Sequence, residues 1–162
     1  MTDKTTTTAR IEGAKALIRA LFDDLWGGQN LSPERVAEFY SPTYKGHDPI
    51  LGETNGPDEV YETITAVRKA FPDTTVDVLD QWGTLDGVGV TITTRYVVRS
   101  THKGEFSGIP ATNNPVELFR VNVDRIIGER IAWSWSCTDS LSFYRQIGSL
   151  PTELASQMSH TR

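Results

Sequence analysis

The segment from Arg130 to Asp139, RIAWSWSCTD, alternates between apolar and small polar residues. Successive side chains of a β-strand point to opposite faces of its sheet. The alternation therefore predicts a strand with one apolar face and one polar face. The apolar face would carry Ile131, Trp133, Trp135 and Cys137, and the polar face would carry Ala132, Ser134, Ser136 and Thr138.

Two earlier segments show the same division. Their apolar residues are Val88, Val90, Ile92, Tyr96 and Val98 in the first segment, and Phe119, Val121 and Val123 in the second. Their polar residues are Thr91, Thr93 and Arg95 in the first, and Arg120, Asn122 and Asp124 in the second. Three segments with this pattern predict an antiparallel sheet whose two faces differ in polarity.

The chain before these segments has the apolar spacing of helices. We expect one helix from Ile11 to about Leu25, a short one from Pro33 to about Tyr40, and a third from Pro57 to Phe71. Residues 44–55 contain one proline and two glycines and are expected to form an irregular loop. Strands are expected at 74–83, 87–101, 115–127 and 129–138, with a short closing helix at 140–147.

Helices followed by a strand meander predict an α+β fold. With 162 residues, the chain is long enough for one hydrophobic core of ordinary size. We assign residues 9–150 to a single domain, residues 1–8 to a frayed N-terminal tail, and residues 151–162 to a C-terminal tail.

Composition excludes several classes of function. The formal net charge is −5 and basic residues do not cluster, which argues against nucleic acid or an anionic membrane surface as a partner. The single cysteine, Cys137, allows no intrachain disulfide and is expected to be a small buried residue. The sequence has neither a secretory apolar core nor an apolar run near the ~20 residues that span a bilayer. We therefore expect a cytoplasmic protein.

The run from Thr101 to Thr112, THKGEFSGIPAT, resembles the signature of the SnoaL-like polyketide and ester cyclase family, within the nuclear transport factor 2-like superfamily. Other elements of that family stand in the expected order. They are Gly56-Pro57, Phe71-Pro72-Asp73, Asp139, and the run YRQIG at 144–148. The resemblance covers roughly residues 10 to 150.

This resemblance implies a cone-shaped fold in which three N-terminal helices pack on a curved, mainly antiparallel sheet and enclose a pocket. Members are usually homodimers without metal or cofactor. The family's pocket lies on the sheet face that would carry Arg95, Asn122, Ser134 and Ser136. Alternation alone also allows that face to be merely solvated. The apolar face would pack against a second copy or, alternatively, rest on the helices.

Neither catalytic set known in such relatives is intact in this sequence. Polyketide cyclases of this kind have an acid/base Asp three residues before the position of Asp139, where this chain has Ser136. They have a polar His where this chain has Asn122. Relatives that open epoxides pair an Arg, matched by Arg95, with an Asp two residues later, where this chain has Val97.

Two residues are candidates for proton transfer. His47 matches a loop position that reaches into the pocket in relatives, and an unperturbed imidazole, with a pKa near 6.5, can accept a proton at neutral pH. It could equally bond nearby backbone. Asp139 would be a competent acid or base if it were buried under the apolar cover. It could equally cap the helix that follows, through the amides of Leu141 or Ser142.

Five residues are candidates for substrate binding. Arg95 would face either a carboxylate such as Asp124 or a carbonyl-bearing ligand. Asn122 and Ser136 could polarise a carbonyl or stabilise an enolate. Tyr44 and Trp82 could line the cavity, although aromatic residues also serve as core.

We therefore predict a cofactor-free enzyme that acts on a hydrophobic, polyketide-like intermediate by aldol-type cyclisation or isomerisation. His47 or Asp139 would remove an acidic α-proton, and Arg95 and Asn122 would stabilise the enolate. The alternatives are an epoxide or ester hydrolase of the same fold and a non-catalytic module that binds a small ligand.

Overall fold

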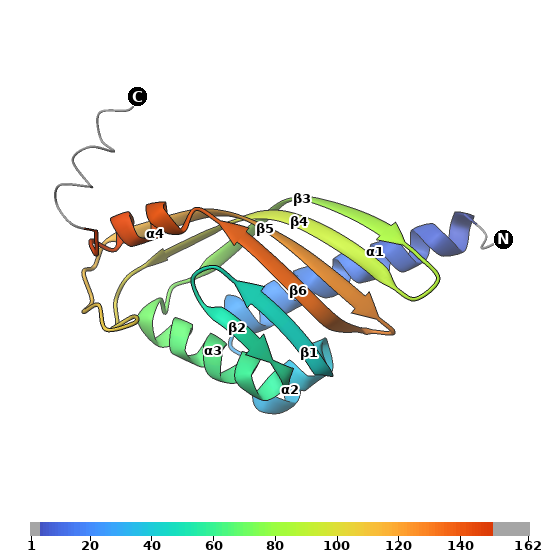
Figure 1. The fold of residues 1–162 in the computed structure, drawn as a ribbon, viewed down its shortest axis with the longest axis horizontal. Coiled ribbons are helices and arrows are strands. Elements are labelled where there is room, and N and C mark those ends of the chain that lie inside the picture. Colours follow the sequence, from blue (N-terminus) through green and yellow to red (C-terminus); the bar gives the residue numbers. More distant parts are fainter. Residues whose placement is uncertain (1–3, 151–162) are drawn as a thin grey trace, which may run out of the picture.

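A computed structural model describes residues 4–150. The helices are α1 (Lys4–Leu21), which continues into the π-helical turn η1 (Phe22–Trp26), α2 (Pro33–Phe39), α3 (Gly56–Ala70) and α4 (Ser140–Gln146). The strands are β1 (Tyr40–Asp48), β2 (Gly52–Asn55), β3 (Thr75–Leu85), β4 (Val90–Thr101), β5 (Pro115–Ile127) and β6 (Arg130–Thr138). All six strands form one sheet in the order β2-β1-β6-β5-β4-β3 (Figure 1). The α+β class and the four expected strands from residue 74 onward are confirmed.

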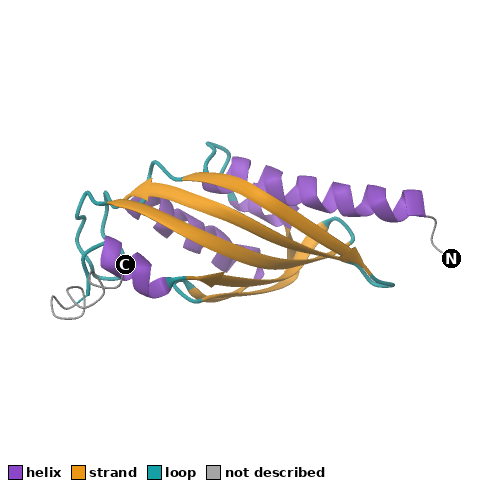
Figure 2. Ribbon diagram, turned by 90° about the horizontal axis from the view of Figure 1, so that it is seen from above, coloured by secondary structure: helices purple, strands orange, loops and turns teal. Residues whose placement is uncertain are grey.

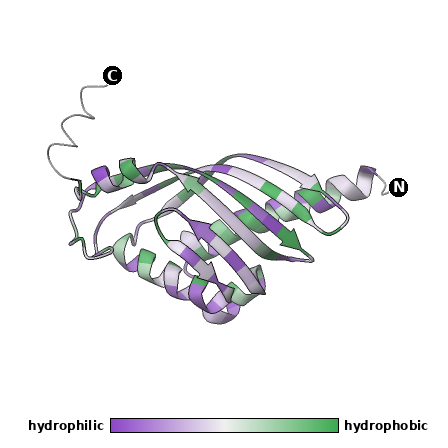
Figure 3. Cartoon of the chain, viewed as in Figure 1, coloured by the Kyte–Doolittle hydropathy of each residue, from purple (hydrophilic) through white to green (hydrophobic). Residues whose placement is uncertain are grey.

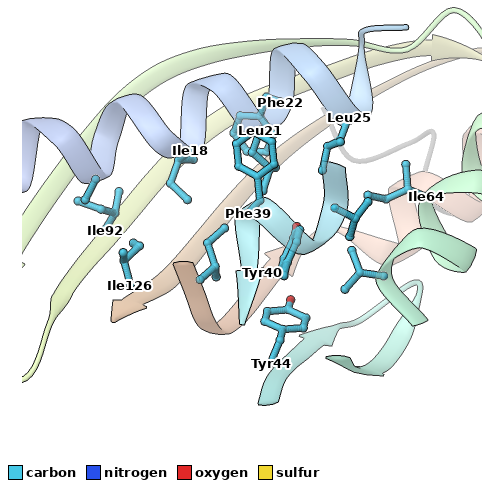
Figure 4. Close-up of a cluster of buried hydrophobic side chains, with 14 of the residues drawn as sticks. Ile18, Leu21, Phe22, Leu25, Phe39, Tyr40, Tyr44, Ile64, Ile92 and Ile126 are labelled. Carbon is cyan, nitrogen blue, oxygen red and sulfur yellow. The ribbon is translucent and has the colours of Figure 1, made fainter. Parts of the chain in front are cut away.

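The helices α1, α2 and α3 cover one face of the curved sheet (Figure 2). Their buried faces supply Ile18 of α1, Leu25 of η1 and Ile64 of α3 to one core cluster, to which the sheet contributes residues such as Ile92 of β4 (Figure 4). Among residues 4–150, no helix lies over the opposite, outer face of the sheet (Figure 2). No helix within residues 4–150 is both long and apolar enough to cross a membrane.

The expected row of three N-terminal helices is wrong, because two strands separate α2 from α3. Residues 44–55, which we expected to form a loop, lie in the hairpin of β1 and β2. Strand β1 pairs in parallel with β6, about 90 residues later, through contacts such as Gly46 with Ser134. Local composition favours a loop here because the partner that makes this segment a strand is distant in the sequence.

The N-terminal tail also differs from expectation. Helix α1 begins at Lys4, so residues 4–8 are helical, and the hydroxyl of Thr8 donates to the carbonyl oxygen of Lys4 (3.0 Å). Residues 1–3 and the expected C-terminal tail from Pro151 lie outside the described residues.

The strands alternate in polarity (Figure 3), but the faces of neighbouring strands do not match as expected. Tyr96 of β4 lies opposite Arg120 of β5, so the apolar set of β4 shares the inner face with the polar set of β5. Strand β6 contains a bulge near Ala132, which turns Ile131 to the inner face while Trp133 stays on the outer face. The inner face is therefore mainly apolar on β4, while on β5 a polar stretch from Arg120 to Asp124 lies between buried apolar residues, and on β6 the polar residues are Ser134 and Ser136.

Gly104, the glycine of the THKG segment, lies where a side chain would have no room. The amides of Lys103 and Gly104 both donate to the carbonyl oxygen of Ala70 (2.8 and 3.0 Å), which joins this segment to the end of α3. A Cβ at Gly104 would collide with the carbonyl oxygen of Lys69.

We expect Gly104→Ala to lower the free energy of unfolding by about 1–3 kcal/mol, since backbone atoms cannot move aside easily. Gly87→Ala is the matched control because its Cβ would meet no atom within 4 Å, and it should change stability by less than about 0.5 kcal/mol. Urea unfolding of the two variants measures both effects. Equal losses in the two would refute the explanation.

Candidate active site

A cavity of about 150 Å³ lies between the inner face of the sheet and the helices. Most of its wall is apolar and comes from the helices and β4, with residues such as Phe22, Ile64, Val67 and Phe71. Its ionisable side chains come mainly from β1 and β5, with one tyrosine from β4. They are Tyr44, Asp48, Arg120 and Asp124, with His47 at the wall and the phenols of Tyr40 and Tyr96. An apolar cavity with a few polar groups is the usual form of a small-molecule site.

Asp124 is the buried carboxyl group of this cavity. It lies on the inner face of β5 and is 3% exposed. The hydroxyl of Ser134 on β6 donates to its Oδ1 atom at 2.6 Å. Burial raises the pKa of Asp124 to about 7, and the hydrogen bond from Ser134 opposes part of that rise. This carboxyl can therefore both accept and donate a proton near neutral pH.

Tyr44 lies beside this carboxyl group. Burial raises the pKa of Tyr44 to about 12, so its hydroxyl remains protonated and can donate a hydrogen bond at neutral pH. The position of the ring depends on Gly46, because a Cβ there would collide with the Tyr44 hydroxyl. The prediction that Tyr44 lines the cavity is thus consistent with its placement.

Asp48 and Arg120 form a largely buried ion pair in the same wall of the cavity. The side chain of Asp48 is 14% exposed and that of Arg120 is 11% exposed. Asp48 Oδ2 accepts from Arg120 Nη2, while Asp48 Oδ1 accepts from the backbone amides of Ile50 (2.9 Å) and Leu51 (3.0 Å). Burial lowers the pKa of Arg120, but Tyr96 and Asp48 outweigh that effect, so its pKa lies above the usual value. Arg120 therefore remains a cation in the wall.

Asn122 stands between Arg120 and Asp124 on the inner face of β5. The hydroxyl of Tyr96 donates to Asn122 Oδ1 at 2.9 Å. This bond uses the carbonyl end of Asn122, so its NH₂ group is the end that a ligand oxygen would meet. Ser136 is also buried and lines the cavity.

The side chains of the two residues predicted to transfer protons are engaged in other contacts. His47 borders the cavity, but its ring packs at a tilt against Trp135 of the outer face (4.3 Å between ring centroids), and its Nδ1 atom forms a hydrogen bond with the carboxylate of Glu53. Asp139 caps α4, since its carboxylate accepts from the amide of Ser142 at 2.9 Å. The N-cap alternative for Asp139 is the one that the structure shows.

Arg95 and Trp82 lie on the outer face instead of in the cavity. The antiparallel register places Arg95 opposite Val121, and its guanidinium pairs with Asp80 of the neighbouring strand. Trp82 lies opposite Thr93 and is 55% exposed. The expectation for Arg95 failed because alternation within one strand does not reveal which faces of adjacent strands coincide. Cys137, expected to be buried, is exposed on this same face.

Sequence reasoning did not select Asp48, Arg120 and Asp124 as site residues. The signal for two of them was present, because Arg120 and Asp124 share the two-residue period of Asn122, which was selected. For Asp48 the local sequence gave no such signal. Its position depends on the pairing of β1 with β6.

The profile of the SnoaL-like polyketide cyclase family matches residues 16–147. The chain belongs to the SnoaL-like polyketide cyclase family. A search among curated protein sequences found no match.

Solved structures similar to this SnoaL-like chain include two proteins proposed to be polyketide cyclases. One, from Jannaschia sp. CCS1, has 20% identity and a TM-score of 0.72, over 88% of this chain and 96% of that one. The other, IdmH from Streptomyces antibioticus, has 27% identity and a TM-score of 0.67, over 83% of this chain and 97% of that one.

A third similar structure is AclR from Streptomyces galilaeus, a proposed hydroxylase, with 22% identity and a TM-score of 0.72 over 87% of this chain and 99% of that one. A protein from Catenulispora acidiphila with a ketosteroid isomerase-like fold matches at 17% identity and a TM-score of 0.65, over 85% of this chain and 95% of that one. The fold of this SnoaL-like chain is therefore the nuclear transport factor 2 and ketosteroid isomerase-like fold.

Proposed function

We propose that this protein is a cofactor-free cyclase that uses Asp124 as its general acid and base on a small, hydrophobic carbonyl compound. The observation that carries the proposal is a carboxyl group with a pKa of about 7 in the wall of an apolar cavity. Membership of the polyketide cyclase family supports the same class of reaction. In this proposal Asp124 takes the role that we expected of His47 or Asp139.

The reaction is an intramolecular aldol-type closure. Ionised Asp124 removes a proton from the carbon next to a substrate carbonyl, and the electron pair of that C–H bond forms the enolate. The NH₂ group of Asn122 and the hydroxyls of Tyr44 and Ser136 lie in the same cavity and stabilise the enolate oxygen. The enolate carbon then attacks a second carbonyl of the substrate, and Asp124 returns its proton to the new alkoxide.

The size of the cavity limits the substrate. A volume of about 150 Å³ admits a molecule of roughly the size of one aromatic ring in other protein interiors. A substrate of several rings would require the wall to move apart. We therefore expect a compact, partly cyclised carbonyl compound to be the form that binds most readily.

The position of Arg95 does not support the alternative of an epoxide hydrolase. Arg95, which matches the Arg of epoxide-opening relatives, pairs with Asp80 on the outer face. A module that only binds ligand would share the cavity but would not need a buried carboxyl that titrates near pH 7. Catalysis is therefore the better account of Asp124.

Proton removal can be tested without the natural substrate. We expect the protein to accelerate the incorporation of deuterium from D₂O at the carbons next to the carbonyl of phenylacetone, a one-ring ketone, and proton NMR follows this exchange. The rate should increase with pH around 7 as Asp124 ionises. An exchange rate equal to that of buffer at every pH would refute the proposal, and mass spectrometry of co-purifying compounds would then identify a bound ligand.

We also propose that the outer face of the sheet joins two copies of the chain. This face exposes a set of large apolar side chains, namely Trp82, Phe119, Val121, Trp133 and Trp135. Ion pairs such as Arg95 with Asp80 and Arg99 with Glu117 lie beside them, so the charged groups around the apolar area are already neutralised within one copy. An apolar centre with a neutral polar border suits contact with an identical face.

We expect the wild-type protein to sediment as a dimer and Phe119→Lys to weaken the dimer by about tenfold or more, because a charge would be buried at the contact. Val88→Lys is the matched control. Val88 is as exposed as Phe119 (66% and 64%) but lies in the turn between β3 and β4. Sedimentation equilibrium measures both variants, and equal effects of the two would exclude this interface.

A further inference from the structure

Arg120 has hydrogen-bonding capacity that the protein leaves unused. Within residues 4–150, three buried side-chain polar atoms have no hydrogen-bond partner: Thr65 Oγ1, His102 Nε2 and Arg120 Nε. Only Arg120 among these residues lines the cavity. Buried donors are normally paired, and an arginine offers five N–H donors. An unpaired donor on a cavity residue therefore indicates a partner that comes with the ligand.

Asp48 cannot satisfy the rest of this guanidinium. One of its oxygens already accepts from the amides of Ile50 and Leu51, and the other accepts from Arg120 Nη2. The turn between β1 and β2 thus fixes the carboxylate, and the carboxylate fixes the guanidinium. Arg120 is held in one orientation before any ligand binds, which favours selective binding.

The charge of this pair restricts the ligand. Asp48 already compensates the positive charge of Arg120, and the described lining contains no lysine and no second arginine. A ligand carboxylate at Arg120 would leave one buried negative charge without a counterion, which is strongly unfavourable. An uncharged oxygen can accept from Arg120 without that cost.

The position of Arg120 separates this contact from the reacting carbon. Arg120 and Asp124 are four residues apart on the same face of β5, which corresponds to about 13 Å along a strand. The oxygen at Arg120 is therefore a different one from the enolate oxygen close to Asp124. A ligand that contacts both residues would carry oxygen functions at both ends.

We propose that Arg120 is the specificity-determining residue of this cavity and that it binds an uncharged keto or phenolic oxygen at the end of the substrate remote from Asp124. This inference rests on the proposed function for the identity of the reacting end. It predicts that Asp48 makes the site selective for uncharged over carboxylate ligands.

The test uses three one-ring probes that differ in a single substituent: phenol, toluene and benzoate. Their dissociation constants are measured by NMR titration at pH 6, where Asp124 is mainly protonated. Asp48→Asn removes the negative charge but keeps the oxygen that accepts from Ile50 and Leu51. The double variant Asp48→Asn with Arg120→Gln replaces the ion pair by an uncharged pair.

We expect Asp48→Asn to bind benzoate about tenfold more tightly than wild type, because Arg120 then lacks its counterion. In the double variant this gain should disappear and phenol should bind about fivefold more weakly than in wild type. Toluene should change by less than about twofold in both variants. A benzoate affinity unaffected by Asp48→Asn, or equal losses for phenol and toluene, would overturn the inference.

Asp124→Asn separates this inference from the proposed function. If phenol affinity depends on Asp124 and not on Arg120, the ligand oxygen lies at the reacting end of the cavity. The proposed role of Arg120 is then refuted, while the acid/base role of Asp124 stands. If the exchange of deuterium into phenylacetone does not depend on Asp124 but the probe affinities follow Arg120, the proposed function fails and the binding site remains.

Discussion

Replacing Asp124 by asparagine is expected to slow the exchange of deuterium into phenylacetone by about 100-fold to 10,000-fold, the usual contribution of a general acid or base. Asparagine keeps the shape of the side chain and still accepts the hydrogen bond that Ser134 donates. It cannot take up a proton at neutral pH. The loss would therefore report proton transfer and not a rearranged cavity.

Asp139→Asn is the matched control for this measurement. Asp139 lies at the N-terminus of α4, and asparagine is as good a helix cap as aspartate. We expect this variant to keep the wild-type exchange rate within about twofold. The assignment of the acid/base role to Asp124 would be wrong if Asp139→Asn lost activity while Asp124→Asn retained it.

The same carboxyl group should make stability depend on pH in an unusual direction. Burial raises the pKa of Asp124 from 3.8 to about 7, so between those two values the folded chain holds a proton that the unfolded chain has released. The contribution of Asp124 to the free energy of unfolding is therefore fully present below pH 4 and is lost as the pH rises toward 7. A shift of this size corresponds to a loss on the order of 4 kcal/mol.

Asp124→Asn should abolish this slope, because asparagine does not titrate. The variant should be more stable than wild type at pH 8, on the order of 4 kcal/mol, and similar to it at pH 4. Urea unfolding at several pH values between 4 and 8 measures the effect. Asp73 does not interfere with this measurement. Lys103 chiefly holds the pKa of Asp73 below its normal value of 3.8, so its ionisation changes the free energy of unfolding only below that pH. A wild-type stability that does not fall between pH 4 and 8 would contradict the burial of Asp124.

If Asp124→Asn is more stable but less active than wild type, the role of Asp124 is catalytic and not structural. An ionised carboxyl in an apolar cavity destabilises the fold at neutral pH. Sites that perform chemistry commonly carry such destabilising groups. Loss of activity together with gain of stability in Asp124→Asn would fit this pattern.

Local pattern predicted the elements whose partners are near in the sequence. The two-residue period of β4, β5 and β6 and the apolar spacing of α1 and α3 are properties of each segment alone, and the structure confirms them. The THKGEFSGIPAT run identified the family by its residues, whereas the constraint on its glycine is tertiary, since Gly104 lies against the carbonyl of Lys69 at the end of α3. The hairpin of β1 and β2 was missed because its parallel partner, β6, is distant in the sequence.

The sequence alone determined the fold class, the family and the sets of residues that share one face of each strand. Only the tertiary structure decided which of those faces meet around the cavity. The register that places Arg95 opposite Val121 turns that arginine outward, and the same register places Arg120 opposite Tyr96 and turns it inward. The physical reason is that alternation fixes side-chain directions within a strand, whereas hydrogen bonding between strands and the helices packed on one face fix which side is buried.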